Sequence, residues 1–168
     1  MNTNDLVIRT AEERDIKALT EIYNHEVLNS TATFDIAPKT EEERLAWLRR
    51  HNRGNHPLIV AEDQGRIAGY ASLSCYRDMQ AYAGTVELSV YVHRQSRGRG
   101  VGEALCRHII DMAKKDGVTV TVVSVNTSSN QASIALHKKL GFEFCGEIKN
   151  VGVKKGRLLS ISNYQLLL

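Results

Sequence analysis

A glycine-rich turn contains the first residues whose types and spacing could do chemistry. Arg97-Gly98-Arg99-Gly100-Val101-Gly102 follows an apolar strand pattern and precedes an amphipathic helix pattern. Glycine lets the backbone approach a ligand closely, and the first N–H groups of a helix lack intrahelical partners. With the positive end of the helix dipole, these groups predict an anion site to which Arg97 and Arg99 would add charge.

Two common nucleotide motifs do not fit this turn. A P-loop requires GxxxxGK[ST], and no lysine follows the glycines. The dinucleotide fingerprint has GxGxxG near the first strand and an acidic residue about twenty positions later. Here GxGxG lies deep in the chain, and apolar Val118 occupies that later position. A glycine-rich turn that holds no ligand is the remaining alternative.

Glu87 is a carboxylate in the middle of an otherwise apolar strand pattern. Alternation along residues 85–93 places Glu87 with Ser89 and Tyr91 on one face of that strand. A carboxylate is costly to bury unless it has a partner or lines a wet cleft. We predict a general base beside the glycine-rich turn; the alternative is an ion pair on a solvated face.

The order of the predicted elements indicates the fold that positions these residues. Strands are predicted over residues 6–9, 58–61, 67–73, 85–93, 118–125, 142–148 and 158–167, and helices over 100–116, 130–140 and behind capping boxes at 10–13 and 40–43. The β-branched run 118–125 is expected to be buried on both faces. This order predicts an α/β fold of one domain over residues 1–168, with a central mixed β-sheet and helices on both faces.

Composition excludes several classes of function. The net charge is +3, from 22 basic and 19 acidic residues, which is too small an excess to favour a nucleic-acid partner. The three cysteines and six histidines have no recognisable metal-ligand spacing, so we assign no metal. The chain lacks both a signal-peptide pattern and an apolar stretch long enough for a membrane, which predicts a cytoplasmic protein with no membrane partner.

At this point the motifs resemble a known family. The strand Thr85–Val92, the Arg97–Gly102 turn, Asn130 and the segment Leu136–Phe142 are similar to those of the GNAT acetyltransferase superfamily. The loop Ala32-Thr33-Phe34-Asp35 extends the resemblance to its phosphinothricin and methionine sulfone/sulfoximine N-acetyltransferase branch. The resemblance covers nearly the whole chain and implies a GNAT fold.

The resemblance also implies an acetyl-CoA site. Pantetheine would lie along Val90-Tyr91-Val92, and the Val90 amide would donate to the thioester oxygen. The pyrophosphate would contact backbone N–H groups between Gly98 and Glu103, and Asn130 would contact the cofactor. The full set implied is Val90, Tyr91, Val92, Arg97, Gly98, Arg99, Gly100, Val101, Gly102, Glu103 and Asn130.

The same resemblance assigns the catalytic and acceptor residues. Glu87 matches the general base that takes the proton of the substrate amine, directly or through water, and His137 stands where many relatives carry a tyrosine that protonates the departing thiolate. A structural role for His137 is the alternative. Residues implied to bind the small-molecule amine are Phe34, Tyr76, Arg77 and Thr85, with Arg77 suited to a substrate carboxylate.

The acceptor half departs from the branch pattern. Tyr82-Ala83-Gly84 replaces a bulkier aromatic or basic segment, and Arg157-Leu158-Leu159-Ser160 replaces a stretch with tryptophan and aspartate. These departures leave the exact amine open, while the resemblance implies acetylation of a small amino-acid-like amine by direct attack in a ternary complex. Acetylation of a protein N-terminus or lysine, or a non-catalytic acyl-CoA sensor, are the alternatives. The resemblance also suggests a homodimer.

Overall fold

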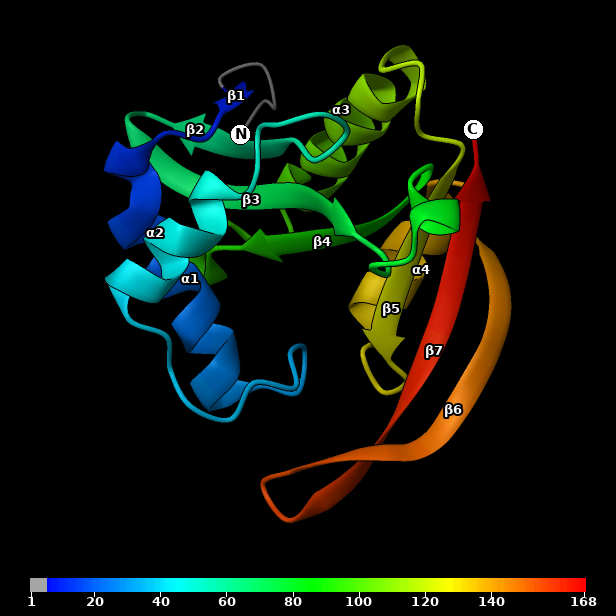
Figure 1. The fold of residues 1–168 in the computed structure, drawn as a ribbon. Helices are drawn as coiled ribbons and strands as arrows, with labels where there is room; N and C mark the ends of the chain where they lie inside the picture. The colour runs from blue at the N-terminus through cyan, green and yellow to red at the C-terminus, as the bar shows by residue number, and fades with distance from the viewer. Residues whose placement is uncertain (1–5) are drawn as a thin grey trace.

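The computed structural model describes residues 6–168, which form one seven-stranded sheet with helices on both faces (Figure 1). The strand order across the sheet is β1-β2-β3-β4-β5-β7-β6. The strands are β1 (Leu6–Thr10), β2 (Leu58–Asp63), β3 (Arg66–Cys75), β4 (Thr85–Val92), β5 (Thr121–Thr127), β6 (Glu143–Lys154) and β7 (Arg157–Leu167). The helices are α1 (Ile16–Asn29), α2 (Glu41–Arg49), α3 (Val101–Lys115) and α4 (Gln131–Lys139). The predicted mixed α/β architecture is confirmed.

The two faces of the sheet bury different apolar clusters. On one face α3 packs through Leu105 and Ile109 against Leu73, Val86 and their neighbours. On the other face α1 and α2 cover a smaller cluster that includes Tyr70. Alternation along β4 therefore places its valines and Leu88 toward α3, and its polar side chains toward α1 and α2.

The central strands β4 and β5 diverge. They form the one parallel pair of the sheet, and only three residues of each strand are paired, Thr85–Glu87 with Thr121–Val123. From Leu88 onward the edge of β4 that faces β5 has no strand partner among residues 6–168. Backbone groups on that edge are therefore available to a ligand, apart from the Val92 carbonyl, which accepts a hydrogen bond from the Arg97 Nε–H at 3.3 Å.

The hairpin of β6 and β7 reaches back to the loop between α1 and α2. Figure 1 shows it curving away from the sheet, with its turn beneath that loop. The Lys154 ammonium donates to the Thr33 carbonyl at 2.7 Å, and the Lys155 ammonium donates to the Leu28 carbonyl at 2.6 Å. The Phe34 ring packs on Gly152. The hairpin turn thus holds the α1–α2 loop against the rest of the domain.

Several local predictions differ from the structure. The first capping box is formed by Glu12 and Asp15, because Thr10 is still part of β1. The second, Thr40 with Glu43, is confirmed: the Thr40 hydroxyl accepts from the Glu43 N–H at 3.1 Å and the Glu43 carboxylate accepts from the Thr40 N–H at 2.8 Å.

The predicted strand 118–125 begins later than expected. Val118 and Val120 are more than half exposed and precede β5. The Asp116 carboxylate accepts hydrogen bonds from the Val118 and Thr119 N–H groups, which holds this segment in a turn. The prediction that the run 118–125 is buried on both faces is therefore wrong for its first residues. Conversely, β6 extends beyond the predicted 142–148 because two irregularities in its register let it continue to Lys154.

Candidate active site

A cavity of about 490 Å³ opens where β4 and β5 diverge. It lies between the end of β4, the glycine-rich turn, α3 and α4. All the residues predicted to hold the cofactor line it except Arg99: Val90, Tyr91, Val92, Arg97, Gly98, Gly100, Val101, Gly102, Glu103 and Asn130. The structure therefore brings the strand edge and the glycine-rich turn to one cleft, which we call the cofactor cleft.

The backbone of the turn is built to present N–H groups. Gly98 and Gly100 have φ of 71° and 79°, a region that side-chain-bearing residues rarely adopt. Gly100 is the residue that precedes α3, and the first helical hydrogen bond runs from the Ala104 N–H to the Gly100 carbonyl at 3.0 Å. The N–H groups of Val101, Gly102 and Glu103 come before it and have no intrahelical acceptor. This end of α3 can bind an anion such as a diphosphate.

The two arginines of the turn are engaged in ion pairs. Arg97 pairs with Glu26, a buried carboxylate of α1 that also lines the cofactor cleft. Arg99 points to the other side of the turn and pairs with Asp63 at 2.8 Å. Sequence reasoning did not find Glu26, because nothing in the local pattern of α1 shows that it meets a residue 71 positions later.

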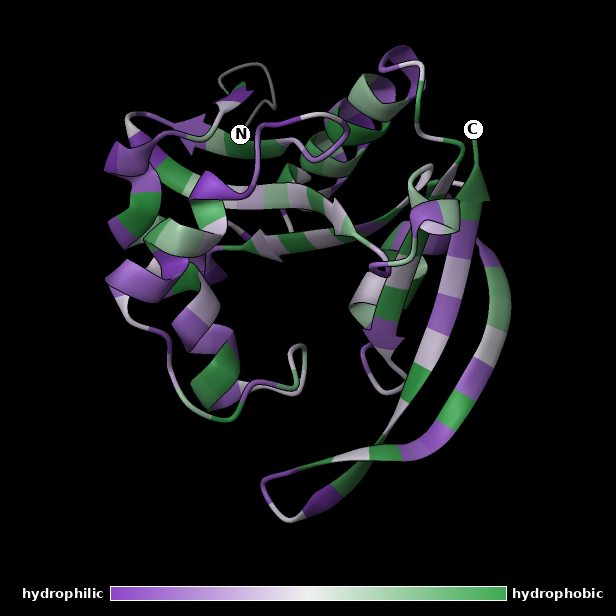
Figure 2. Cartoon of the chain, viewed as in Figure 1, coloured by the Kyte–Doolittle hydropathy of each residue, from purple (hydrophilic) through white to green (hydrophobic). Residues whose placement is uncertain are grey.

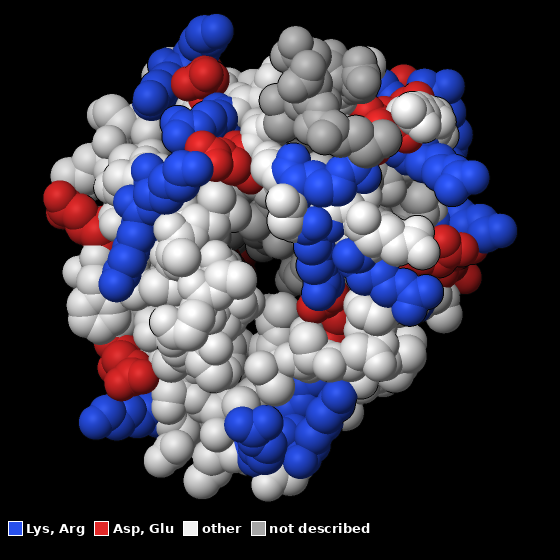
Figure 3. Space-filling model, turned by 180° about the vertical axis from the view of Figure 1, so that it is seen from behind, with Lys and Arg blue, Asp and Glu red and all other residues white. Residues whose placement is uncertain are grey.

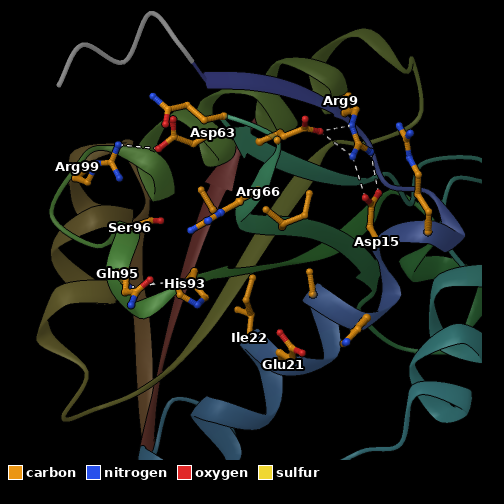
Figure 4. Close-up of a pocket in the computed structure, with 18 residues that line it drawn as sticks. Arg9, Asp15, Glu21, Ile22, Asp63, Arg66, His93, Gln95, Ser96 and Arg99 are labelled. Atoms are coloured by element: carbon orange, nitrogen blue, oxygen red, sulfur yellow. Dashed lines mark hydrogen bonds and ion pairs between the residues drawn. The ribbon is translucent and has the colours of Figure 1, made fainter.

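Arg99 borders a second cavity, of about 900 Å³, between the start of α1 and the turn joining β2 to β3 (Figure 4). Its charged side chains are largely matched with one another: Arg9 with Asp15 and Glu62, and Arg99 with Asp63. Figure 3 shows the back of the molecule, where basic and acidic side chains also lie beside each other around a hollow near the centre. This cavity contains none of the predicted catalytic residues.

Glu87 lies on the face of β4 that is turned toward α1 and α2. Its register partner is Ser74 on β3, and Ser89 follows on the same face. The Glu87 carboxylate has no hydrogen bond or ion pair with any residue in the range 6–168, and burial raises its pKa above the usual glutamate value. A half-buried carboxylate with raised pKa and no structural partner is suited to accept a proton.

His137 is buried on α4, with its ring edge-on to Phe142. Its Nδ1 lies 2.7 Å from the Ser133 carbonyl, which makes Nδ1 the protonated nitrogen of the neutral ring. Burial lowers the pKa of His137, and Nε2 has no hydrogen-bond partner among residues 6–168. His137 does not itself line the cofactor cleft, although Ser133 and Leu136 of the same helix do.

The predicted acceptor residues lie on three separate segments. Phe34 is on the α1–α2 loop, 39% exposed, against the hairpin turn. Arg77 follows β3, and its guanidinium carbon lies 5.1 Å from the Tyr76 ring centroid. Thr85 begins β4 on the same face as Glu87. The strand register therefore places Thr85 on the Glu87 face of the sheet, while Phe34 and Arg77 lie on loops outside it.

A third cavity, of about 320 Å³, lies between α2 and this same face. We call it the aromatic pocket because Tyr23, Trp47, Tyr70 and Tyr91 line it. Arg44 of α2 is buried in its wall at 6% exposure. The sequence carries only a partial signal of this pocket. Arg44 and Trp47 lie one helical turn apart, which places them on one helix face, but this spacing does not show that the face meets Tyr70.

Within residues 6–168 there is no cluster of three or more histidine, cysteine or acidic side chains able to hold a metal ion. The helices described in that range are also too short or too polar to cross a bilayer.

Comparison with known proteins identifies the family. Residues 8–160 match the family model described as Acetyltransferase (GNAT) domain. The L-methionine sulfoximine/L-methionine sulfone acetyltransferase of Salmonella typhimurium is 40% identical over 97% of this chain and 95% of its own length. The phosphinothricin N-acetyltransferase of Streptomyces coelicolor is 37% identical over 97% and 96%. A Salmonella typhimurium acetyltransferase solved with acetyl-CoA superimposes with a TM-score of 0.93 at 39% identity, covering 97% of this chain and 94% of that one. The chain belongs to the GNAT acetyltransferase family.

Proposed function

We propose that this acetyltransferase transfers the acetyl group of acetyl-CoA to the amine of a small amino acid, of the methionine sulfone, methionine sulfoximine or phosphinothricin type. The observation that carries the proposal is the unpartnered Glu87 carboxylate on the strand that also borders the cofactor cleft. The names of the relatives support an amino-acid acceptor.

Acetyl-CoA fits the cofactor cleft and supplies the acetyl group as a thioester. The unpaired edge of β4 at Val90–Val92 can hydrogen-bond an extended pantetheine arm as a neighbouring strand would. The N–H groups between Gly98 and Glu103 bind the diphosphate, and Arg97 lies beside them. Asn130, which precedes α4, contacts the cofactor from the opposite wall. The Val90 N–H donates to the thioester oxygen as negative charge develops there.

Glu87 takes the proton of the substrate ammonium and so delivers a free amine. An amine of pKa roughly 8–10 is only about 0.1–10% unprotonated at pH 7. The amine nitrogen then forms a bond to the thioester carbonyl carbon and loses its second proton as the amide forms, while the carbon–sulfur bond breaks and the thiolate leaves with the electron pair and takes up a proton. Glu87 is suited to this step because its raised pKa makes it a stronger base than a solvated glutamate.

His137 protonates the thiolate only after it has itself gained a proton. The neutral ring donates Nδ1–H to Ser133, so Nε2 carries a lone pair rather than a proton. We therefore assign His137 as a relay: Nε2 accepts the second proton of the amine nitrogen, which is released as the amide forms, and passes it to the thiolate.

The acceptor binds between the Glu87 face, the α1–α2 loop and the end of β3. Arg77 binds the substrate α-carboxylate, and Tyr76, Phe34 and Thr85 enclose the rest. Arg77 is exposed and has no carboxylate partner within residues 6–168, which leaves its guanidinium available.

We further propose that the protein acts in the cytoplasm as one domain over residues 1–168, and that it is a homodimer. The hairpin of β6 and β7 exposes Ile148, Val151, Val153 and Leu158, each about half exposed or more. Figure 2 shows apolar and polar bands alternating along both strands. A self-complementary contact would bury these side chains. Light scattering should give twice the mass of 18.8 kDa, and Val153→Glu should give the single mass; a wild-type monomer contradicts the dimer.

The function is tested by following CoA thiol release from acetyl-CoA with a panel of amines. The panel contains methionine sulfone, phosphinothricin, common amino acids, polyamines and a short peptide. Turnover with amino acids supports the proposal. Turnover with the peptide alone replaces it with protein acetylation, and turnover with none, despite acetyl-CoA binding, replaces it with a sensor.

A further inference from the structure

The aromatic pocket contains a buried positive charge without an anion. The Arg44 guanidinium carbon lies 3.8 Å from the Trp47 ring centroid and 4.4 Å from that of Tyr23. One Nη donates to the Tyr70 hydroxyl at 3.0 Å. The Nε of Arg44 has no hydrogen-bond partner, and no carboxylate among residues 6–168 lies within ion-pair distance of the guanidinium. A guanidinium stays charged under all ordinary conditions.

The aromatic rings offset only part of the cost of burying this charge. Cation–π contacts are worth about 0.5–2 kcal/mol, whereas burying an unpaired ion costs several kcal/mol. The carboxylates at the mouth of the pocket are already engaged. Asp35 accepts from the Tyr23 hydroxyl at 2.5 Å and pairs with Lys39 at 3.4 Å. The pocket therefore has the electrostatics of an anion site.

The pocket is continuous with the face that carries Glu87. Its floor includes Ser74 and Ser89, which are the register partner of Glu87 and the next residue on the same face of β4. Its far end is formed by Tyr70 and Tyr91, which are themselves register partners. Ser89, at the near end of the pocket, lies two residues beyond Glu87, about 7 Å along the strand at roughly 3.4 Å per residue. A substrate with its amine at Glu87 can thus place the end of a side chain such as that of 2-aminoadipate over the serine-lined floor, on the side from which Arg44 is approached.

We propose that the aromatic pocket binds an acidic group at the far end of the acceptor side chain, and that Arg44 is its counter-charge. This proposal rests on the proposed function, since it places the acceptor amine at Glu87. The α-carboxylate stays close to the amine and cannot reach Arg44, so the preferred acceptors are amino acids whose side chains end in a carboxylate or another oxoacid. The hydroxyls of Tyr70, Ser72 and Ser89 provide further donors along the pocket.

Trp47 allows this site to be tested without catalysis. It is the only tryptophan of the chain and it stacks on Arg44. Titrating 2-aminoadipate into the wild-type protein in the absence of acetyl-CoA should change the tryptophan fluorescence in a saturable way, and norleucine should not. The response should disappear in Arg44→Met and persist in Arg49→Met, which removes an exposed arginine of the same helix.

Steady-state kinetics provide a second test of the role of Arg44. The ratio of kcat/KM for glutamate to that for glutamine isolates the terminal charge, because the two side chains have nearly the same size. A charge-assisted interaction of this kind corresponds to about 10- to 100-fold, and Arg44→Met should remove that preference while the kcat/KM with glutamine changes less.

The outcomes separate the two proposals. Absence of amino-acid turnover overturns the proposed function, while the fluorescence titration still decides whether the pocket binds an acid. An equal response to acid and neutral ligand, or an acid preference that survives in Arg44→Met, overturns the role of Arg44. If Arg44→Met does not fold, as judged by circular dichroism, the wild-type comparison of 2-aminoadipate with norleucine decides the question alone.

Discussion

The cofactor cleft and the acceptor side are built in different ways. The cofactor cleft is made mostly from one continuous stretch, β4 through α4, and it presents backbone N–H groups. The acceptor side is assembled from α1, α2, the end of β3, β4 and the hairpin turn, and it presents side chains. A backbone site tolerates many changes of side chain but depends on conformation, whereas a side-chain site changes its specificity with single substitutions. The comparison implies that acetyl-CoA use and acceptor choice can be altered separately.

The largest expected effect is at the junction of the two regions. Glu87→Gln removes the proposed general base but preserves the shape of the side chain, and general-base catalysis typically contributes about 10²- to 10⁴-fold. We expect kcat/KM for the amine to fall by that factor, while the affinity for acetyl-CoA, measured by calorimetry, is retained. Glu41→Gln, an exposed change on α2, is the control. An unchanged rate in Glu87→Gln would remove this residue from the mechanism.

A change in the backbone of the turn should affect the cofactor alone. Gly100→Ala places a side chain at φ 79°, where the left-handed conformation costs an L-residue roughly 1–2 kcal/mol. We expect the KM for acetyl-CoA to rise about 5- to 30-fold, with the order of preference among amine acceptors unchanged. A variant that alters acceptor preference instead would show that the two regions are coupled.

A change at the hairpin turn should have the opposite selectivity. A Cβ on Gly152 would lie 2.5 Å from a ring atom of Phe34, so Gly152→Ala must displace that ring. Overpacking of about 1 kcal/mol corresponds to about a 5-fold increase, which we expect in the KM for the amine. The KM for acetyl-CoA measured on the same preparation is the internal control. An equal rise in the two KM values would contradict the separation of acetyl-CoA binding from acceptor binding.

The smallest effect is on stability. Burial raises the pKa of Glu87 in the folded protein, so the folded state binds its proton more tightly than the unfolded chain does. This contribution favours folding below the unfolded pKa of about 4.3 and is lost as pH rises through the higher folded value. Glu87→Gln should therefore be more stable than the wild type at neutral pH, with the difference closing in acid. Denaturant midpoints at several pH values measure it, and a wild type that is the more stable protein at neutral pH would indicate a hidden partner for Glu87.

Local sequence patterns predicted the cofactor side more completely than the acceptor side. The glycines at positions 98 and 100 predicted a backbone that a ligand can approach closely, and in the structure both adopt a positive φ. Alternation along β4 predicted Glu87 and Tyr91 on one face, as observed. Arg97 and Arg99 look alike in the sequence, yet only Arg97 lines the cofactor cleft. The directions of the two arginine side chains depend on their ion-pair partners, Glu26 and Asp63, which belong to elements distant in the sequence.

The sequence alone determined the elements and the chemistry they carry: a glycine-rich turn between a strand and a helix, a carboxylate on the polar face of that strand, and a mixed α/β order. These features follow from contacts between residues close along the chain. Only the tertiary structure decided that β4 and β5 part after Glu87, that the hairpin turn meets Thr33, and that Arg44 is buried without an anion beside Trp47. Those contacts join segments tens of residues apart, and such pairings are set by the packing of whole elements, which no local pattern records.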